Sequence, residues 1–149
     1  MKPDVAVVMQ GFFATLLMDI APNLNAEYSV GNASIMGLSL FVAAEEFERA
    51  AEVRVRENEE MRALFAEGAT VVADKEFAGR LLDASKSKEG SLRISALNET
   101  NDALAKLLIE LQVALESGKG AAVNALDGKV WDYLVAAAER RKFNLPSFG

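Results

Sequence analysis

The sequence contains no histidine and no cysteine. The absence of both excludes Ser-His-Asp and Cys-His catalysis, thiolate or imidazole zinc sites, the Glu-x-x-His di-iron pattern of ferritin-like bundles and histidine-ligated haem. Only oxygen-ligand or amine chemistry is left, and we expect no cofactor and favour a non-enzymatic role. Without cysteine there are no disulfides, which fits a cytoplasmic location.

Basic residues are fewer than acidic ones. The chain has 16 Lys and Arg against 22 Asp and Glu, a net charge of -6. Affinity for nucleic acid comes mostly from Lys and Arg neutralising phosphates, and anionic membrane surfaces attract the same residues. The composition therefore predicts neither nucleic-acid binding nor binding to an anionic membrane.

Proline is also scarce, with three residues that all stand where a helix could begin or end: Pro3, Pro22 and Pro146. No stretch alternates apolar and polar residues as a half-buried strand does. At 149 residues the chain has the common size of one domain. We therefore expect an all-α fold, a single-domain bundle of about five helices spanning residues 1–149.

Apolar residues at helical spacing indicate five helices. We expect a first helix over 4–21, ended by Pro22, and a long central helix that starts between 25 and 32 and ends before Gly68. A third helix covers 70–84, and residues 69–73 could be extended instead. Residues 85–90 form a loop, with Ser91 as N-cap of a helix over 92–117. A last helix over 121–142, with a possible break at Asp127-Gly128, forms an antiparallel pair with it, and 143–149 form an irregular tail. Continuity of the central helix through Gly31-Asn32 stays open.

Two of these helices carry apolar seams with one polar member each. The seam of the fourth helix is Ile94, Leu97, Asn101, Leu104, Leu108, Leu111 and Leu115. The seam of the central helix is Leu40, Ala44, Phe47, Ala51, Val55, Met61 and Phe65, interrupted by Asn58, with the charged residues of that helix facing water. A buried amide demands a partner and fixes helix register or oligomeric state. Asn58 is the candidate partner for Asn101.

Five residues are candidates for a ligand site. Asp19 lies in an apolar stretch, where a carboxylate is unusual, and it could line an apolar cavity between the first two helices together with Tyr28 and Glu45 or Glu46. Asn32 and Trp131 are scarce side chains that could line a pocket. Simpler interpretations are that Asp19 caps a loop and that Trp131 anchors a core or an interface. No spacing predicts a metal site.

Charge is nearly absent from the first 44 residues, where only Lys2, Asp4, Asp19 and Glu27 are charged. The uncharged run from 5 to 18 is shorter than the roughly 20 residues that a membrane span needs. The run from 28 to 44 is diluted by Ser, Gly and Asn, and we expect no membrane span.

Two helices with so little polar surface favour association, and Gly11 and Gly37 would let helix backbones approach closely. The leading hypothesis is a non-enzymatic protein that forms a homo-oligomer, with a dimer favoured, and binds another protein. One alternative is a small-ligand-binding or carboxylate-based catalytic bundle with a pocket between the first two helices. Another is a lipid-surface protein that uses the same helices, although it would lack a basic flank.

Overall fold

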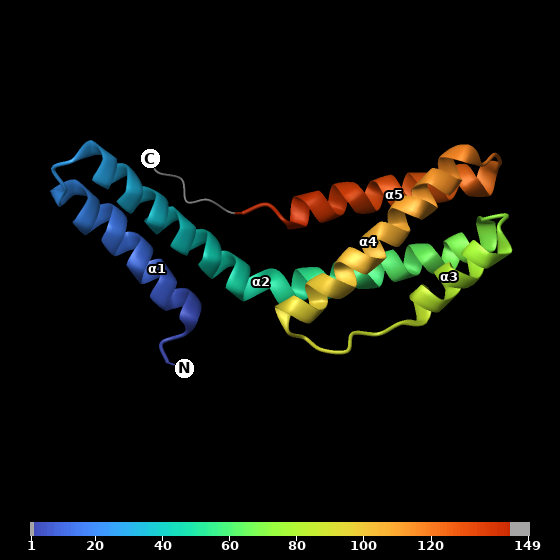
Figure 1. The fold of residues 1–149 in the computed structure, drawn as a ribbon, viewed down its shortest axis with the longest axis horizontal. Helices are drawn as coiled ribbons and strands as arrows, with labels where there is room; N and C mark the ends of the chain where they lie inside the picture. Colours follow the sequence, from blue (N-terminus) through green and yellow to red (C-terminus); the bar gives the residue numbers. More distant parts are fainter. Residues whose placement is uncertain (1, 144–149) are drawn as a thin grey trace. The chain divides into compact units, whose positions relative to one another are not determined.

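The computed structural model describes residues 2–143, which form five helices and no strand (Figure 1). The helices are α1 (Val5–Thr15), α2 (Glu27–Val71), α3 (Lys75–Lys86), α4 (Ile94–Ser117) and α5 (Ala121–Arg140). The predicted all-α fold, with five helices and a long central one, is confirmed. Contacts divide the described residues into unit 1, residues 2–50 with Phe143, and unit 2, residues 51–142. The interpretation of 1–149 as a single domain stays a prediction.

Unit 1 is a helical hairpin of α1 and the N-terminal part of α2. After α1 the chain winds through a π-helical turn, Leu16–Ile20, and a 3-10 turn, Ala21–Asn23, which contains Pro22 and ends the helical run. The rings of Phe13 and Phe41 pack 5.3 Å apart between centroids. A Cβ added to Gly37 would lie 2.5 Å from Leu17 Cδ1, so glycine permits the close approach of the two helices.

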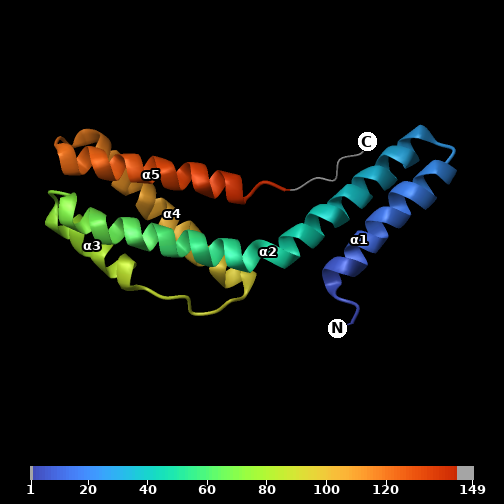
Figure 2. The ribbon, with the colours of Figure 1, turned by 180° about the vertical axis from the view of Figure 1, so that it is seen from behind.

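Unit 2 is a four-helix arrangement of the C-terminal part of α2 with α3, α4 and α5 (Figure 2). Its core consists of Met61, Leu64, Phe65, Leu81, Leu104, Leu108, Leu111, Leu115, Leu126 and Val130. The seam predicted for α4 is confirmed from Leu97 to Leu115, whereas Ile94, the first residue of the helix, is 40% exposed. The α4–α5 pair is joined by a short turn at 118–120, as expected for antiparallel neighbours.

The end predicted for the central helix is wrong, because α2 continues through Gly68 to Val71. A Cβ at Gly68 would lie 3.0 Å from Leu111 Cδ1 and 3.3 Å from Leu81 Cδ1. Glycine is used here for close packing within the helix and not for the left-handed conformation that ends one. The helix is also continuous through Gly31-Asn32, and Phe47 of the predicted seam is 60% exposed.

The connections around α3 also differ from the prediction. The helix begins at Lys75 and not at 70, because the Asp74 carboxylate accepts hydrogen bonds from the backbone N–H groups of Glu76 and Phe77 at 2.8 and 3.1 Å. It continues to Lys86, so the loop predicted over 85–90 covers 87–93. Ser91 is not the N-cap of α4; Arg93 holds that position.

The last helix shows no break at Asp127-Gly128 and ends at Arg140, earlier than predicted. Phe143 is outside any helix, and residues 144–149 of the predicted irregular tail lie outside the described residues.

Gly68 and Gly79 provide a matched pair of substitutions. Gly68→Leu should destabilise the protein by about 1–3 kcal/mol because the larger side chain overpacks against Leu111 and Leu81. Gly79→Ala, at an exposed site in α3 with no atom near the added Cβ, should stabilise it by about 1 kcal/mol through helix propensity. Urea denaturation measures both values, and a destabilised Gly79→Ala protein would contradict the assigned helix.

Candidate functional site

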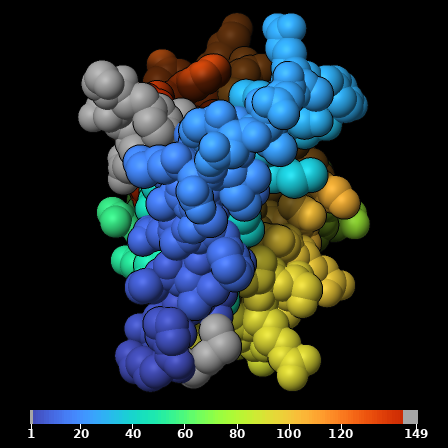
Figure 3. Space-filling view, turned by 90° about the vertical axis from the view of Figure 1, so that its left-hand side faces the viewer, coloured from blue at the N-terminus to red at the C-terminus, as the bar shows by residue number. Residues whose placement is uncertain are grey.

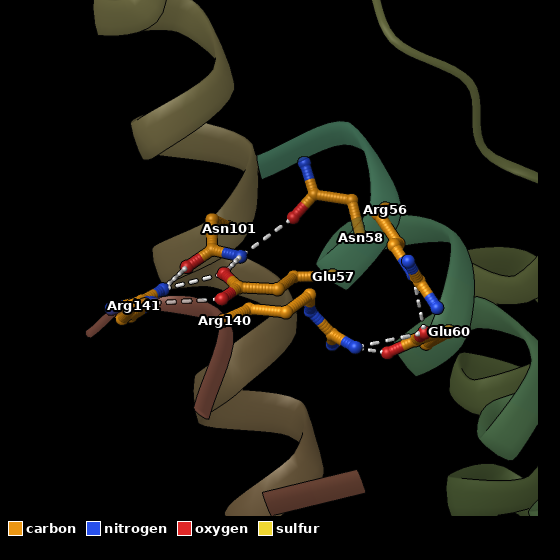
Figure 4. A network of polar contacts seen from close by, with 7 residues as sticks. All are labelled: Arg56, Glu57, Asn58, Glu60, Asn101, Arg140 and Arg141. Atoms are coloured by element: carbon orange, nitrogen blue, oxygen red, sulfur yellow. Dashed lines mark hydrogen bonds and ion pairs between the residues drawn. The ribbon is translucent and has the colours of Figure 1, made fainter. Parts of the chain in front are cut away.

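Glu57 is a charged residue of α2 whose side chain is fully buried in unit 2. Arg141, which follows the last residue of α5, donates from Nε to Glu57 Oε1 at 2.8 Å and from Nη2 to Glu57 Oε2 at 2.6 Å (Figure 4). This two-bond geometry matches the planar guanidinium to the carboxylate. The pair joins residues 84 positions apart and fixes the end of α5 on α2.

Asn101 links this ion pair to Asn58. Its amide nitrogen donates to Asn58 Oδ1 at 2.8 Å and to Glu57 Oε2 at 3.3 Å, and its oxygen accepts from Arg141 Nη2 at 3.1 Å. The predicted contact between the two seam amides is confirmed. Their role in register or oligomeric state stays a prediction.

Two further sets of contacts extend this group, called here the buried polar network. On one side, Asn58 and Arg62 both donate to Glu89 Oε1, at 3.1 and 2.6 Å, and Arg62 Nε donates to Ser87 Oγ at 2.9 Å. These contacts hold the loop after α3 on α2. On the other side, Glu60 accepts from both terminal nitrogens of Arg140 and from Arg56 Nε (Figure 4). The network therefore connects α2 to α4, to the end of α5 and to the loop.

Sequence reasoning missed Glu57 and Arg62, which belong to the charged half of the central helix that was expected to face water. Both are buried, with Arg62 only 8% exposed. They face the interior because Arg141 and Glu89 neutralise them there. The only sequence signal was their position beside Asn58 and Met61 of the apolar seam.

None of the five ligand candidates lines any of the main cavities of residues 2–143. Asp19 is exposed rather than enclosed by apolar side chains, and Tyr28 is 82% exposed. Asn32 is half-buried. Glu45 forms an ion pair with Arg49, with 4.0 Å between Glu45 Oε2 and Arg49 Nη1. Trp131 is 53% exposed in α5, so it is not a core residue, whereas its interpretation as an interface anchor stays a prediction. Ligand binding by these residues stays a prediction.

Of the two glycines proposed for close helix approach, Gly37 is buried against α1, whereas Gly11 has no atom near the position of a Cβ. Within residues 2–143, no group of three or more acidic side chains is placed to hold a metal ion.

A groove of about 380 Å³ lies between α4 and α5, with Asn101, Tyr133 and Arg141 among its lining residues. Burial, assisted by the nearby Glu57 carboxylate, raises the pKa of Tyr133 to about 12. The phenol is therefore neutral at physiological pH and is not poised as a base.

The hairpin of unit 1 differs from unit 2 in how much of its apolar surface is covered. The helical run Val5–Asn23 is 19 residues long and apolar enough to cross a membrane by length and composition, and only 11% of it is buried. One such helix near the N-terminus is weak evidence for a span. The absence of a span stays a prediction.

No family model, no curated protein and no solved structure matches this chain.

The Glu57–Arg141 pair predicts an asymmetric response to mutation. Arg141→Met should cost about 3–5 kcal/mol of unfolding free energy, because it leaves a fully buried carboxylate without its charged partner. Glu57→Gln should lower the unfolding free energy by less, because the Arg141 side chain is half-exposed and water can still solvate its charge. Adding Glu57→Gln to Arg141→Met should restore part of the loss.

Lys129→Met is the control for these substitutions. It removes an exposed ion pair with Glu67 between the same two helices and should cost below about 1 kcal/mol. Chemical denaturation of the two single variants, the double variant and Lys129→Met measures their unfolding free energies and hence the coupling between Glu57 and Arg141. Equal losses for Arg141→Met and Lys129→Met would contradict the structural role of the network.

The pKa of Tyr133 gives a second prediction. The folded protein holds the phenolic proton up to about pH 12, whereas an unfolded chain releases it near 10. The stability contributed by this group is thus complete below pH 10 and is lost as the pH rises towards 12. Tyr28→Phe leaves Tyr133 as the sole tyrosine. Its phenolate absorbance should then titrate near 12, and a midpoint near 10 would contradict the burial.

Proposed function

We propose that this chain is a non-enzymatic helical protein that acts by self-association and by binding another protein, through the hairpin of unit 1. The supporting observation is a set of large apolar side chains that stand exposed on it. These side chains, which lie on more than one side of the two helices and are called here the hairpin face, are Val7, Phe12, Met18, Ile20, Tyr28, Ile35, Met36, Leu38 and Phe47. Figure 3 views the hairpin from one side, with the side chains of α1 and the start of α2 at the surface.

The hairpin buries little of its own apolar surface. Its buried apolar residues are Phe13, Ala21, Ala33, Ala44 and Ala50, of which only Phe13 is large. Fully burying a Leu, Ile, Phe or Met side chain contributes about 1.5–3 kcal/mol. The exposed residues of the hairpin face therefore represent a large driving force for covering this face with another apolar surface.

Unit 2 supports the non-enzymatic part of the proposal. The carboxylates of Glu57, Glu60 and Glu89 are each bound to a guanidinium group. A carboxylate engaged in this way holds helices and loops together and has oxygens already occupied by guanidinium donors. The buried polar network is best explained as a structural element that holds α4, the end of α5 and the loop after α3 on α2.

Methionine oxidation tests whether the hairpin face is covered in the working protein. Met18 and Met36 are 75% and 59% exposed, whereas Met61 in the core is 1% exposed. Mild peroxide converts accessible methionine to the sulfoxide. If the face is an association surface, Met18 and Met36 should be protected in cell extract or in concentrated pure protein, relative to the pure protein at high dilution.

Met61 serves as the internal control, because it should remain protected at every concentration while the bundle is folded. Peptide mass spectrometry reports the three residues separately. Rapid oxidation of both Met18 and Met36 in extract, in concentrated protein and in dilute protein alike would show a permanently wetted face and would exclude the proposed function.

A further inference from the structure

We propose that the side of α2 that faces away from α1 is a docking site for the segment 144–149 of the same chain, which binds there in continuation of Phe143. The contact lies within unit 1 and goes beyond the proposed function, which does not require it. It covers part of the hairpin face, at Ile35 and Leu38, and leaves the apolar side chains of α1 accessible.

The docking site begins as an open groove that already holds Phe143. The groove has a volume of about 450 Å³, and its lining residues are Leu38, Ser39, Val42, Ala43, Glu46 and Phe143. The guanidinium carbon of Arg49 lies 5.8 Å from the centroid of the Phe143 ring, within the range of a cation–π contact. The segment that follows Phe143 therefore starts at this groove.

The groove belongs to a side of α2 that α1 does not cover. An α-helix turns by about 100° per residue, so Ile35, Leu38 and Val42 lie within about 60° of one another around the helix axis. Gly37, which packs against Leu17 before α2 begins, lies about 130° away from them. A second element can therefore bind to this side of α2 without displacing α1.

Exposure of the apolar side chains on this side increases with their distance from Phe143. Leu38, beside Phe143 in the groove, is 41% exposed, Ile35 is 66% exposed and Tyr28 is 82% exposed. Between the last two, Gly31 has no atom near the position of a Cβ and leaves the helix surface open. Phe143 thus covers one end of a longer apolar stripe.

The segment itself, Asn-Leu-Pro-Ser-Phe-Gly, has the chemistry of this stripe. It has two large apolar residues, Leu145 and Phe148, and no charge. Residues 28–44 of α2 are likewise uncharged, whereas residues 45–62 carry seven Glu and four Arg. Docking towards the N-terminal end of α2 therefore buries no charged group. Pro146 favours an extended backbone at the residue before it, as a segment lying along a helix needs.

The length and attachment of the segment favour it over a second copy as the occupant. An extended chain advances about 3.3 Å per residue and a helix 1.5 Å, so the five steps from Phe143 to Phe148 match about eleven residues of α2. That distance reaches from Val42 to Gly31. Because the segment is attached at Phe143, its effective concentration at the groove is of the order of millimolar, which a second copy at micromolar concentration does not reach.

Thiol alkylation tests whether the segment covers the groove, since the chain has no cysteine of its own. Ser39→Cys places a small reporter in the groove. In the full chain at high dilution, replacing both Leu145 and Phe148 by serine should raise the rate at which N-ethylmaleimide modifies this thiol by about tenfold, because the apolar contacts that hold the segment are lost.

Two controls isolate the apolar contacts. Replacing Asn144 by serine and Ser147 by alanine changes the same segment but keeps its apolar residues, and it should leave the rate at position 39 unchanged. Ser117→Cys is the matched reporter in unit 2, because Ser117 and Ser39 are both exposed and both donate to the carbonyl oxygen four residues earlier, at 2.9 and 2.8 Å.

An unchanged rate at position 39 in the Leu145→Ser and Phe148→Ser double variant would overturn the proposal, and protection that appears only in concentrated protein would then assign the groove to a second copy. An equal rise at position 117 would show a general loosening of the protein and would overturn it as well.

Disulfide formation within one chain tests which side of the hairpin the segment contacts. Ser147→Cys combined with Ile35→Cys should form an intramolecular disulfide faster than Ser147→Cys combined with Phe12→Cys. Ile35 and Phe12 are matched in exposure, at 66% and 57%, but Phe12 lies on α1. Equal or faster disulfide formation with position 12 would overturn the assignment to this side of α2.

Discussion

Covering the apolar side of a helix with a second helical layer is the constraint on which the rest of this structure depends. Unit 2 meets it internally, because the C-terminal part of α2 packs with α3, α4 and α5 around Phe65, Leu81 and Leu111, which are fully buried. Unit 1 does not meet it, because its two helices contact each other on one side only. The C-terminal part of α2 thus has its apolar side covered in unit 2, whereas the N-terminal part of the same helix, in unit 1, leaves apolar side chains exposed.

The buried polar groups of unit 2 are expected to specify the register of its helices, which apolar packing alone does not. Leucine seams tolerate sliding by a helical turn, whereas Glu57 is satisfied only when Arg141 and Asn101 are opposite it. A displaced α5 would leave this carboxylate buried without its cation. We therefore expect the network to select one packing arrangement of α2, α4 and α5 among several with similar apolar contact, and this role in register stays a prediction.

The sequence predicted those features that depend on neighbours along one helix. The α4 seam follows from the spacing of Leu97 to Leu115, and the Asn58–Asn101 contact follows from one amide in each of two seams. Glu57 and Arg62 could not be placed, because a charged residue is buried only if its partner arrives from elsewhere in the fold. Gly68 was misjudged for a related reason, since the methyl groups that require glycine there belong to α3 and α4. Asp19 stands in an apolar stretch and Trp131 was a candidate for a core or interface anchor, but whether such residues are exposed depends on how many helices cover them.

The central claim is that the hairpin of unit 1 self-associates through the hairpin face. Hydrogen–deuterium exchange of the pure protein as a function of concentration tests it most directly, with the backbone amides of α4 as the internal reference. The account predicts that amides of α1 are protected in concentrated protein and lose protection on dilution, while α4 stays protected throughout. Exchange in α1 that is fast at every concentration would contradict it.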